Sequence, residues 1–195
     1  MTASAEALTK SQAARRQRVL LAALQLGADG GYDAVQMRDV AATAGVALGT
    51  IYRYFPSKDA LLAAAMVEWM EDLERRVTQK APKGDTTAER VYDVLRRGVA
   101  TMERQPQLAE AVITALTSDD REAGGASVAT TDVMQRVMLR AFPDDVAPDL
   151  EADIAKVLGH VWFSCLIAWS NGGGDLVWVA EELETACHLL CDHLG

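Results

Sequence analysis

The stretch that decides the fold is residues 35–62, VQMRDVAATAGVALGTIYRYFPSKDALL. Apolar residues such as Val40 and Ala44 recur at helical spacing, which predicts a short helix with one buried face. Gly45 suits the left-handed conformation that ends a helix, and the chain then resumes as a second helix over residues 49–55. The pattern predicts a helix-turn-helix, whose second helix enters the major groove of DNA.

This segment resembles the DNA-binding core of TetR-type transcriptional regulators. The resemblance rests on AGVALGTIYRYFPSKDALL and covers about residues 15–62, including a preceding helix and the GGYDAV turn. Two positions depart from the family pattern: a serine or threonine commonly opens the first motif helix, where Gln36 and its neighbours stand, and a serine often stands at Ala47. Within the family, residues 30–58 and the later run VWFSCLIAWS are most similar to actinobacterial repressors of sterol catabolism, the KstR-like group.

The candidate DNA-contacting residues divide by chemistry. Thr50 and Arg53 offer a hydroxyl and a guanidinium to base edges, and a neighbouring apolar side chain suits a thymine methyl. The resemblance implies that Tyr52, Tyr54 and Lys58 hold phosphate oxygens. For one tyrosine and for the phenylalanine that follows, the alternative is packing in a small core. The full candidate set is Gln36, Arg38, Ala47, Leu48, Thr50, Tyr52, Arg53, Tyr54 and Lys58.

The charge distribution supports a basic head on an acidic body. The chain has a formal net charge of −9, yet residues 1–60 carry seven basic and five acidic groups, or +2, and the other 135 residues carry 12 basic and 23 acidic groups, or −11. DNA affinity follows the local potential at the contact surface, so the overall acidity does not exclude DNA binding. Arg15, Arg16 and Arg18 either approach DNA or form a solvated helix face.

Helical periodicity runs through the whole chain, without the alternation that marks strands, so we predict an all-α fold. We expect residues 1–57 to form the helix-turn-helix domain and residues 58–195 to form a ligand-binding and dimerisation domain. Ser57 is placed to cap the helix that joins them. Besides the motif, helices are expected over residues 10–28, 58–80, 88–104, 107–117, 127–142, 148–170 and 176–194, with breaks near Gly30-Gly31, residues 81–86, Pro106, Gly124-Gly125, Pro143 and residues 172–174.

The second domain is rich in methionine and aromatic side chains, which adapt to large apolar ligands. Ordinary core packing is the alternative for each of them. The TetR-type resemblance implies that a small-molecule effector binds here and spreads the two DNA-reading heads of a dimer, and the KstR-like resemblance implies a steroid or other acyl-CoA thioester. The alternatives are a different hydrophobic effector, such as a fatty acyl-CoA or a drug, and a DNA-binding protein that responds to no ligand. The predicted ligand-binding residues are Trp69, Met70, Met102, Leu108, Val112, Ile113, Leu116, Met134, Met138, Trp162, Phe163 and Leu166.

Four arginines are candidates for the effector's phosphates, although exposed arginines on helices also occur simply solvated: Arg96, Arg97, Arg104 and Arg136. A homodimer is expected from the symmetry of palindromic operators and from the apolar last two helices, where the resemblance also places the interface. The expected partners are therefore a double-stranded DNA operator, a small hydrophobic effector and a second copy of the chain.

The sequence gives weaker support for other kinds of functional site. Cys187 and Cys191 share a helix face with two histidines nearby, but we expect a core or interface role and no metal or cofactor. His160 is expected to be a core or pocket histidine, and the Asn171 glycine run is expected to be a loop. An enzyme using the apolar cavity is the opposing class, but no nucleophile with a partnered histidine is evident. Three cysteines, the lack of a signal segment and the lack of an 18-residue uncharged apolar run favour a cytoplasmic protein without a membrane partner.

Overall fold

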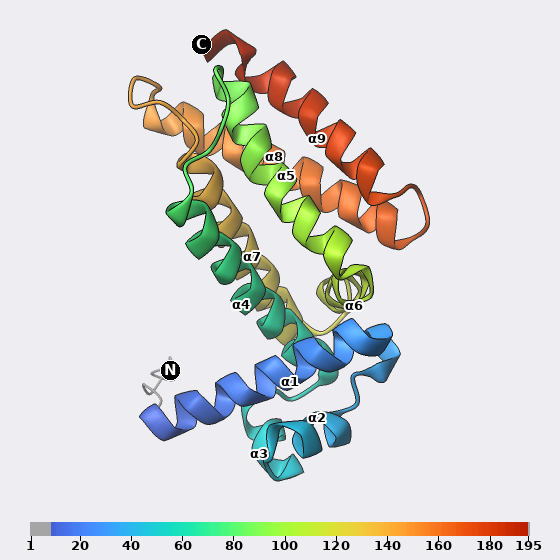
Figure 1. The fold of residues 1–195 in the computed structure, drawn as a ribbon. Coiled ribbons are helices and arrows are strands. Elements are labelled where there is room, and N and C mark those ends of the chain that lie inside the picture. The colour runs from blue at the N-terminus through green and yellow to red at the C-terminus, as the bar shows by residue number, and fades with distance from the viewer. Residues whose placement is uncertain (1–8, 195) are drawn as a thin grey trace.

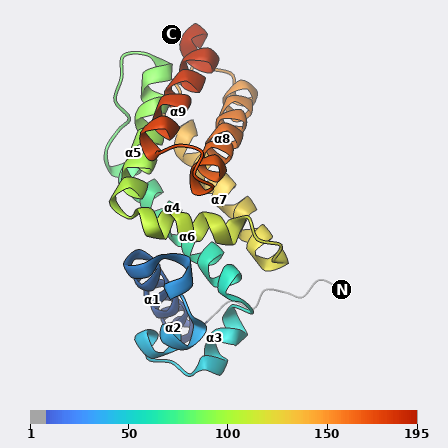
Figure 2. The ribbon, with the colours of Figure 1, turned by 90° about the vertical axis from the view of Figure 1, so that its right-hand side faces the viewer.

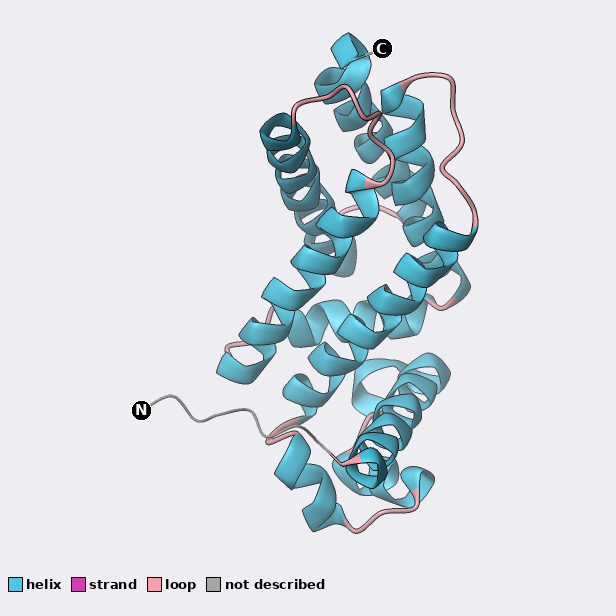
Figure 3. Cartoon of the chain, turned by 90° about the vertical axis from the view of Figure 1, so that its left-hand side faces the viewer, coloured by secondary structure: helices cyan, strands magenta, loops and turns pink. Residues whose placement is uncertain are grey.

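The computed structural model describes residues 9–194 of the chain, which form nine α-helices and one terminal 3-10 turn with no strand among them (Figures 1 and 3). The expected all-α fold is thus confirmed. The helices are α1 Lys10–Ala34, α2 Met37–Ala44, α3 Leu48–Tyr54, α4 Lys58–Gln79, α5 Thr87–Arg104, α6 Pro106–Leu116, α7 Arg121–Leu139, α8 Pro148–Ser170 and α9 Leu176–Cys191, followed by the turn Asp192–Leu194.

The helices form a small head and a larger body (Figure 1). Helices α1, α2 and α3 make the head at one end, and α4 runs from the head into the body, where it packs along α7. Helix α6 lies across the end of the body nearest the head and packs against α1 (Figure 2). Helices α5, α8 and α9 complete the body, with α9 packed on both α5 and α8.

Local sequence signals explain most helix boundaries. Helix α5 begins with a capping box, in which Thr86 accepts from the backbone N–H of Glu89 and the Glu89 carboxylate accepts from that of Thr86. Proline occupies the first turn of α6 and α8, where its missing N–H costs nothing. Ser57 caps α4 as expected, because its Oγ accepts from the Ala60 N–H at 2.9 Å. The predicted bounds of α8 agree with the observed ones.

Of the two breaks predicted at paired glycines, one is confirmed and one is wrong. Gly30 and Gly31 leave helical geometry inside α1, so the long helix breaks where expected and a separate last turn follows to Ala34. Gly31 has a φ of 70°, which produces the kink between the two parts. The helix expected from residue 127 starts at Arg121, so Gly124 and Gly125 lie inside α7 and not in a loop. Packing of α7 along α4 outweighs the low helix propensity of two glycines.

Helix α8 is long and apolar enough to resemble a membrane-spanning segment in length and composition. Only 33% of its most apolar window is buried inside the chain. The helix nonetheless packs on α7 and α9, and Leu158, Trp162 and Leu166 point into the core. One face of α8 is therefore buried, and its other side, which carries the 44%-exposed Val157 among polar residues, stays uncovered by the chain itself.

Candidate DNA-binding surface and ligand cavity

The head has the geometry of a helix-turn-helix. Gly45 ends α2 in the left-handed conformation with a φ of 64°, and its N–H donates to the Ala42 carbonyl at 3.2 Å. Val40 and Ile51, one from each motif helix, are fully buried, so the two helices share one small core. Phe55 is 3% exposed, which confirms its core role. A left-handed glycine between two short helices anchored by their apolar faces fixes the angle at which α3 leaves the turn.

Helix α3 and its N-cap carry the residues predicted to contact bases, together with Tyr52, which is predicted to contact a phosphate. Tyr52 is 50% exposed and Arg53 is exposed, while Thr50 and Leu48 are half-buried in the first turns of the helix. Ala47 is exposed at the N-cap and makes no side-chain cap, as its departure from the family pattern implied. These side chains together offer donors, an aromatic hydroxyl and methyl groups on one short helix.

Tyr54 and the first motif helix occupy a less open position. Tyr54 is half-buried beside the ring of Phe55, and the guanidinium of Arg53 lies 5.3 Å from the centroid of the Tyr54 ring. Gln36 and Arg38 are exposed at the start of α2, and the Gln36 side-chain amide donates to the Asp33 carbonyl at 2.8 Å. DNA contact by each of these groups stays a prediction.

Lys58 lies at the start of α4 with its charge turned toward α1. Its ammonium donates to the Tyr32 carbonyl at 3.2 Å and lies 3.5 Å from the centroid of the Tyr32 ring. The Tyr32 hydroxyl in turn donates to Asp59 at 2.5 Å, and burial followed by this carboxylate raises the pKa of Tyr32 to about 12. Lys58 therefore ties α4 to the head in DNA-free protein, and a phosphate contact requires its ammonium to turn away from the ring.

The arginines of α1 are not simply solvated. The Arg16 guanidinium lies 5.3 Å from the centroid of the Phe55 ring, and the Arg18 Nε donates to the Ala44 carbonyl at 3.3 Å. Both contacts hold α1 against the motif helices and leave positive charge on the head.

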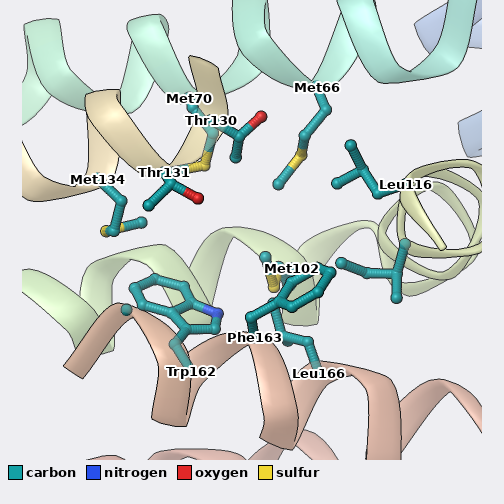
Figure 4. Close-up of a pocket in the computed structure, with 12 residues that line it drawn as sticks. Met66, Met70, Met102, Leu116, Thr130, Thr131, Met134, Trp162, Phe163 and Leu166 are labelled. Carbon is teal, nitrogen blue, oxygen red and sulfur yellow. The ribbon is translucent and has the colours of Figure 1, made fainter. Parts of the chain in front are cut away.

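The body contains an apolar cavity between α4, α5, α6, α7 and α8 (Figure 4). Its volume is about 50 Å³. Eight of its lining residues were predicted from sequence: Met70, Met102, Ile113, Leu116, Met134, Trp162, Phe163 and Leu166. The lining that the structure describes has no histidine, cysteine or carboxylate, so it offers apolar contact rather than acid–base chemistry.

The structure places four predicted ligand residues elsewhere. Val112 and Met138 are fully buried in the core outside the cavity wall, and Leu108 lies against Gly27 of α1. Trp69 is half-buried and lines a narrow neighbouring slot. Helical periodicity predicts that a residue is buried, but it does not predict whether the buried side chain lines a cavity.

Sequence reasoning missed four lining residues: Met66, Thr130, Thr131 and Gly159. Met66 precedes Met70 by one helical turn and so shares its face, a signal that the spacing carried. The two threonines carried no such signal, because a polar residue in α7 is ordinarily assigned to the solvent side. Gly159 matters by its lack of a side chain, since a Cβ added there meets nothing within 4 Å.

The narrow slot lies between the cavity and a basic groove. The slot shares Met70 and Met102 with the cavity, and it shares Leu73 and Thr101 with a surface groove of about 300 Å³ between α4 and α5. The cations that line the groove are Arg76, Lys80, Arg97 and Arg104.

Among the predicted phosphate-binding arginines, Arg97 and Arg104 lie in this groove. Arg97 is paired with Asp93 and donates to the Lys80 carbonyl at 2.7 Å. The other two lie outside it. Arg96 pairs with Glu103 at 3.1 Å, and Arg136 pairs with Glu74, where its hydrogen bond is the main cause that lowers the pKa of the Glu74 carboxyl.

The C-terminal cysteines are core residues. Cys187 and Cys191 are fully buried free thiols, and burial raises their pKa values to about 12 and about 11. His188 points away and pairs with Asp192 at 2.9 Å. The expectation for His160 is wrong: it lies on the exposed face of α8, because the turn that places Trp162 inward turns His160 outward.

Comparisons with known proteins agree with this geometry. Residues 19–65 match the family model described as bacterial regulatory proteins, tetR family, and residues 84–190 match the tetracyclin repressor-like C-terminal domain. The chain is 38% identical over 182 residues to the HTH-type transcriptional repressor KstR of Rhodococcus jostii strain RHA1, covering 93% of this chain and 85% of that protein.

Two solved structures share the fold. A TetR transcriptional regulator from Rhodococcus sp. RHA1 superposes with a TM-score of 0.79 at 30% identity, over 95% of this chain and 100% of that one. The Thermus thermophilus FadR, a TetR-family transcriptional repressor in complex with lauroyl-CoA, superposes with a TM-score of 0.67 at 24% identity, over 90% of this chain and 92% of that one.

Proposed function

Because the chain belongs to the TetR family of bacterial transcriptional regulators and is a repressor like KstR, we propose that an acyl-CoA thioester releases it from a palindromic operator. The apolar part of the effector occupies the cavity of the body, and its phosphates lie in the basic groove. The protein acts as a homodimer in the cytoplasm, with residues 1–57 reading DNA and residues 58–195 binding effector and partner.

One observation carries the choice of effector: a slot that shares lining residues with both lies between the apolar cavity and the basic groove. Met70 and Met102 belong to the cavity and the slot, and Leu73 and Thr101 belong to the slot and the groove. A ligand that follows this path needs an apolar end, a slender middle and an anionic end. Acyl-CoA thioesters have this order of parts, and the FadR protein of the same fold carries lauroyl-CoA.

The groove supplies unsatisfied positive charge. Lys80 and Arg104 have no acceptor for their side chains among the described residues, whereas Arg76 and Arg97 are paired with Asp72 and Asp93. Free cations near paired ones attract a polyanion without first breaking an ion pair, and phosphate is bound well by such clusters.

The cavity is too small for such a ligand in the conformation described here. Its volume of about 50 Å³ is well below the roughly 300–1,000 Å³ of sites for drug-sized ligands. Entry must therefore separate its walls, which the flexible side chains of Met66, Met70 and Met134 ease. Met66 and Met70 lie on α4, so enlargement of the cavity displaces the helix that leads to the head.

Two further contacts connect the body to the head. Ser57 at the start of α4 donates to Asp120 in the loop before α7 at 2.5 Å. Helix α1 packs on α6 with Gly27 against Leu108, at a separation that leaves no room for a Cβ. A shift of α4, α6 or α7 is thus transmitted to the orientation of α3. A ligand that binds better to the shifted state lowers DNA affinity by that difference in binding free energy.

Exposed apolar side chains on α8 and α9 support a second copy as partner. Val157 on α8 is 44% exposed, Val177 on α9 is 57% exposed, and much of the most apolar part of α8 is not covered by its own chain. Two such helix pairs related by a two-fold axis cover each other's strips, which gives the symmetry that a palindromic operator needs.

The test is effector-dependent release of DNA. The full-length protein is bound to a fluorescent duplex that it has itself selected from a random library, and release is followed by anisotropy. Steroid acyl-CoA, fatty acyl-CoA, acyl-pantetheine without the nucleotide phosphates and the free acid are compared. We expect the acyl-CoA forms to release DNA at about tenfold lower concentration than the matched acyl-pantetheine.

The double variant Lys80→Gln/Arg104→Gln should remove that difference, whereas Arg136→Gln, outside the groove, should retain it. Equal potency of free acid and acyl-CoA, or loss of the difference in Arg136→Gln alone, would contradict the assignment of the groove.

A further inference from the structure

Tyr32 of α1 contacts the first two residues of α4. The Lys58 ammonium lies 3.5 Å from the centroid of the Tyr32 ring and donates to the Tyr32 carbonyl at 3.2 Å, and the Tyr32 hydroxyl donates to the Asp59 carboxylate at 2.5 Å. Helix α4 packs on α1 where the chain leaves the head (Figure 1). One half-buried residue of the head therefore holds a cation and a carboxylate that are adjacent in the sequence.

The glycine kink in α1 brings Tyr32 to this place. Gly31 has a φ of 70° and a ψ of −162°, a conformation that glycine adopts readily and other residues do not. The last turn of α1 therefore follows a course separate from the rest of the helix. This turn is anchored, because the Val35 N–H donates to the Tyr32 carbonyl at 3.3 Å and the Val35 side chain is fully buried. The backbone thus fixes Tyr32 beside the start of α4.

The partners of Lys58 are neutral groups. Among the described residues its ammonium contacts a carbonyl oxygen and an aromatic ring, and it forms no ion pair with Asp59 or with another carboxylate. A cation–π contact at a partly exposed site is weak, whereas a hydrogen bond between an ammonium and a phosphate is charge-assisted on both sides. A DNA phosphate can therefore take up this ammonium without first breaking an ion pair.

Asp59 is a competitor for the Lys58 ammonium. It follows Lys58 directly in the chain and contacts the same tyrosine. Burial, followed by the hydrogen bond to this carboxylate, raises the pKa of Tyr32 to about 12, so the hydroxyl keeps its proton and donates at neutral pH. Without that donor the carboxylate is free to pair with the ammonium, and its charge also repels a phosphate nearby.

We propose that Tyr32 is a positioning residue for DNA binding, whose hydroxyl holds Asp59 away from Lys58 so that the ammonium stays available to a phosphate of the operator. This rests on the proposed function only in taking the head to bind DNA, and it is independent of the effector. Tyr32 acts through two neighbouring side chains on α4. Its effect on DNA affinity therefore requires the charges of both.

The test is a set of variants measured by fluorescence anisotropy on the duplex that the full-length protein selects from a random library. Tyr32→Phe retains the ring and loses only the hydroxyl, so DNA binding should weaken about tenfold as Asp59 competes for Lys58. The double variant Tyr32→Phe/Asp59→Asn should restore wild-type affinity, because the competing charge is gone. Tyr92→Phe, which removes the hydroxyl of a half-buried tyrosine in α5 of the body, should bind DNA like the wild type.

The salt dependence of binding separates this role from a merely structural one. Each phosphate neutralised by a lysine contributes about 0.9 to the slope of log affinity against log salt concentration, so Tyr32→Phe should reduce the slope by about that amount for each head bound. Lys58→Gln should reduce the slope equally. Adding Tyr32→Phe to Lys58→Gln should change neither the slope nor the affinity any further.

The rescue by Asp59→Asn decides the matter. If the double variant Tyr32→Phe/Asp59→Asn binds DNA as weakly as Tyr32→Phe, or if Tyr32→Phe weakens binding as much in the Lys58→Gln background, the hydroxyl does not act through these two residues and its positioning role is overturned. An unchanged salt slope in Lys58→Gln overturns that role as well. Each of these results leaves the proposed function in place, which fails instead if the wild-type protein selects no duplex.

A second variant covers the case in which Tyr32→Phe unfolds the head, as a lowered melting temperature would reveal. Asp59→Asn alone retains the tyrosine hydroxyl and removes the competing charge, so it should bind DNA at least as tightly as the wild type. Weaker binding by Asp59→Asn, with an unchanged melting temperature, would show that the carboxylate supports DNA binding directly and would overturn the role of Tyr32.

Discussion

The head and the body of this protein solve opposite packing problems. The head buries Val40, Ile51 and Phe55 in a small closed core and turns its polar groups outward. The body leaves a cavity among methionines and tryptophan, with one buried donor unsatisfied. A closed core holds a recognition helix in one orientation, whereas an imperfect one can be enlarged by a ligand. On the proposed function, the head is the part that reads DNA and the body is the part that a ligand enlarges.

The head and the body also differ in net charge. Residues 1–60 carry a net charge of +2 and the other 135 residues carry −11. Within the acidic body, Lys80 and Arg104 lie in one groove with Arg76 and Arg97, and neither forms an ion pair among the described residues. The acidic body keeps DNA from binding indiscriminately, and its local basic groove still suits a phosphorylated ligand.

The largest predicted effect comes from a substitution that destabilises the head and leaves the body folded. Ile51→Ala removes a fully buried side chain from the small core and should destabilise the head by about 2–5 kcal/mol. DNA affinity should be lost, while an acyl-CoA should still raise the melting temperature of the body. Leu158→Ala, equally buried in the body, is the matched control and should weaken ligand binding first. If Ile51→Ala abolishes the ligand-induced thermal shift as well, the head and body are not separate stability units.

The contrast between local and distributed sites explains what could be predicted from sequence. The helix-turn-helix is contiguous, so Gly45 and the apolar spacing around it specified the turn and the buried face together. The cavity is assembled from five helices, and residues such as Thr130 and Gly159 line it only because of how those helices cross. The paired glycines at residues 30–31 break their helix as predicted, whereas those at residues 124–125 lie inside α7, where tertiary packing overrode their low helix propensity.

The second prediction sharpens the role of the head. Arg53→Ala should cost about 1–3 kcal/mol of discrimination at one base pair, because a guanidinium reads guanine in the major groove. Tyr52→Phe should instead weaken binding to all duplexes alike, since a phosphate contact carries no sequence information. Binding to a set of single-base operator variants measures both effects. Uniform weakening by Arg53→Ala would place this side chain on the DNA backbone.

The third prediction concerns a substitution that fills the cavity. Gly159→Leu places a side chain into open space in the cavity wall, so DNA binding should persist while the effector concentration needed for release rises about tenfold. Gly159→Ala and Gly125→Ala, both in helices with free space for a Cβ, should each stabilise the fold by about 0.5–1 kcal/mol. The two alanine variants separate the effect of helix propensity from the effect of filling the cavity. An unchanged effector response in Gly159→Leu would move the ligand out of this cavity.

The smallest effect concerns the link between the two regions. Ser57→Ala removes the cap of α4 and the hydrogen bond to Asp120, and should lower stability by about 1 kcal/mol. It should also change the ratio of DNA affinities with and without effector, because the contact joins head to body. Ser118→Ala, which alters the same loop without touching α4, should leave that ratio unchanged. Equal behaviour of the two variants would exclude the Ser57 contact from signal transmission.

The central claim is that occupancy of the body cavity releases the head from DNA. The most direct measurement is a simultaneous titration of acyl-CoA binding and DNA release, by calorimetry and anisotropy, on wild-type protein and Gly159→Leu. The account predicts that wild-type protein releases DNA as the site fills, and that Gly159→Leu stays bound to DNA over the same range. Saturation of wild-type protein by acyl-CoA with no loss of DNA affinity would contradict it.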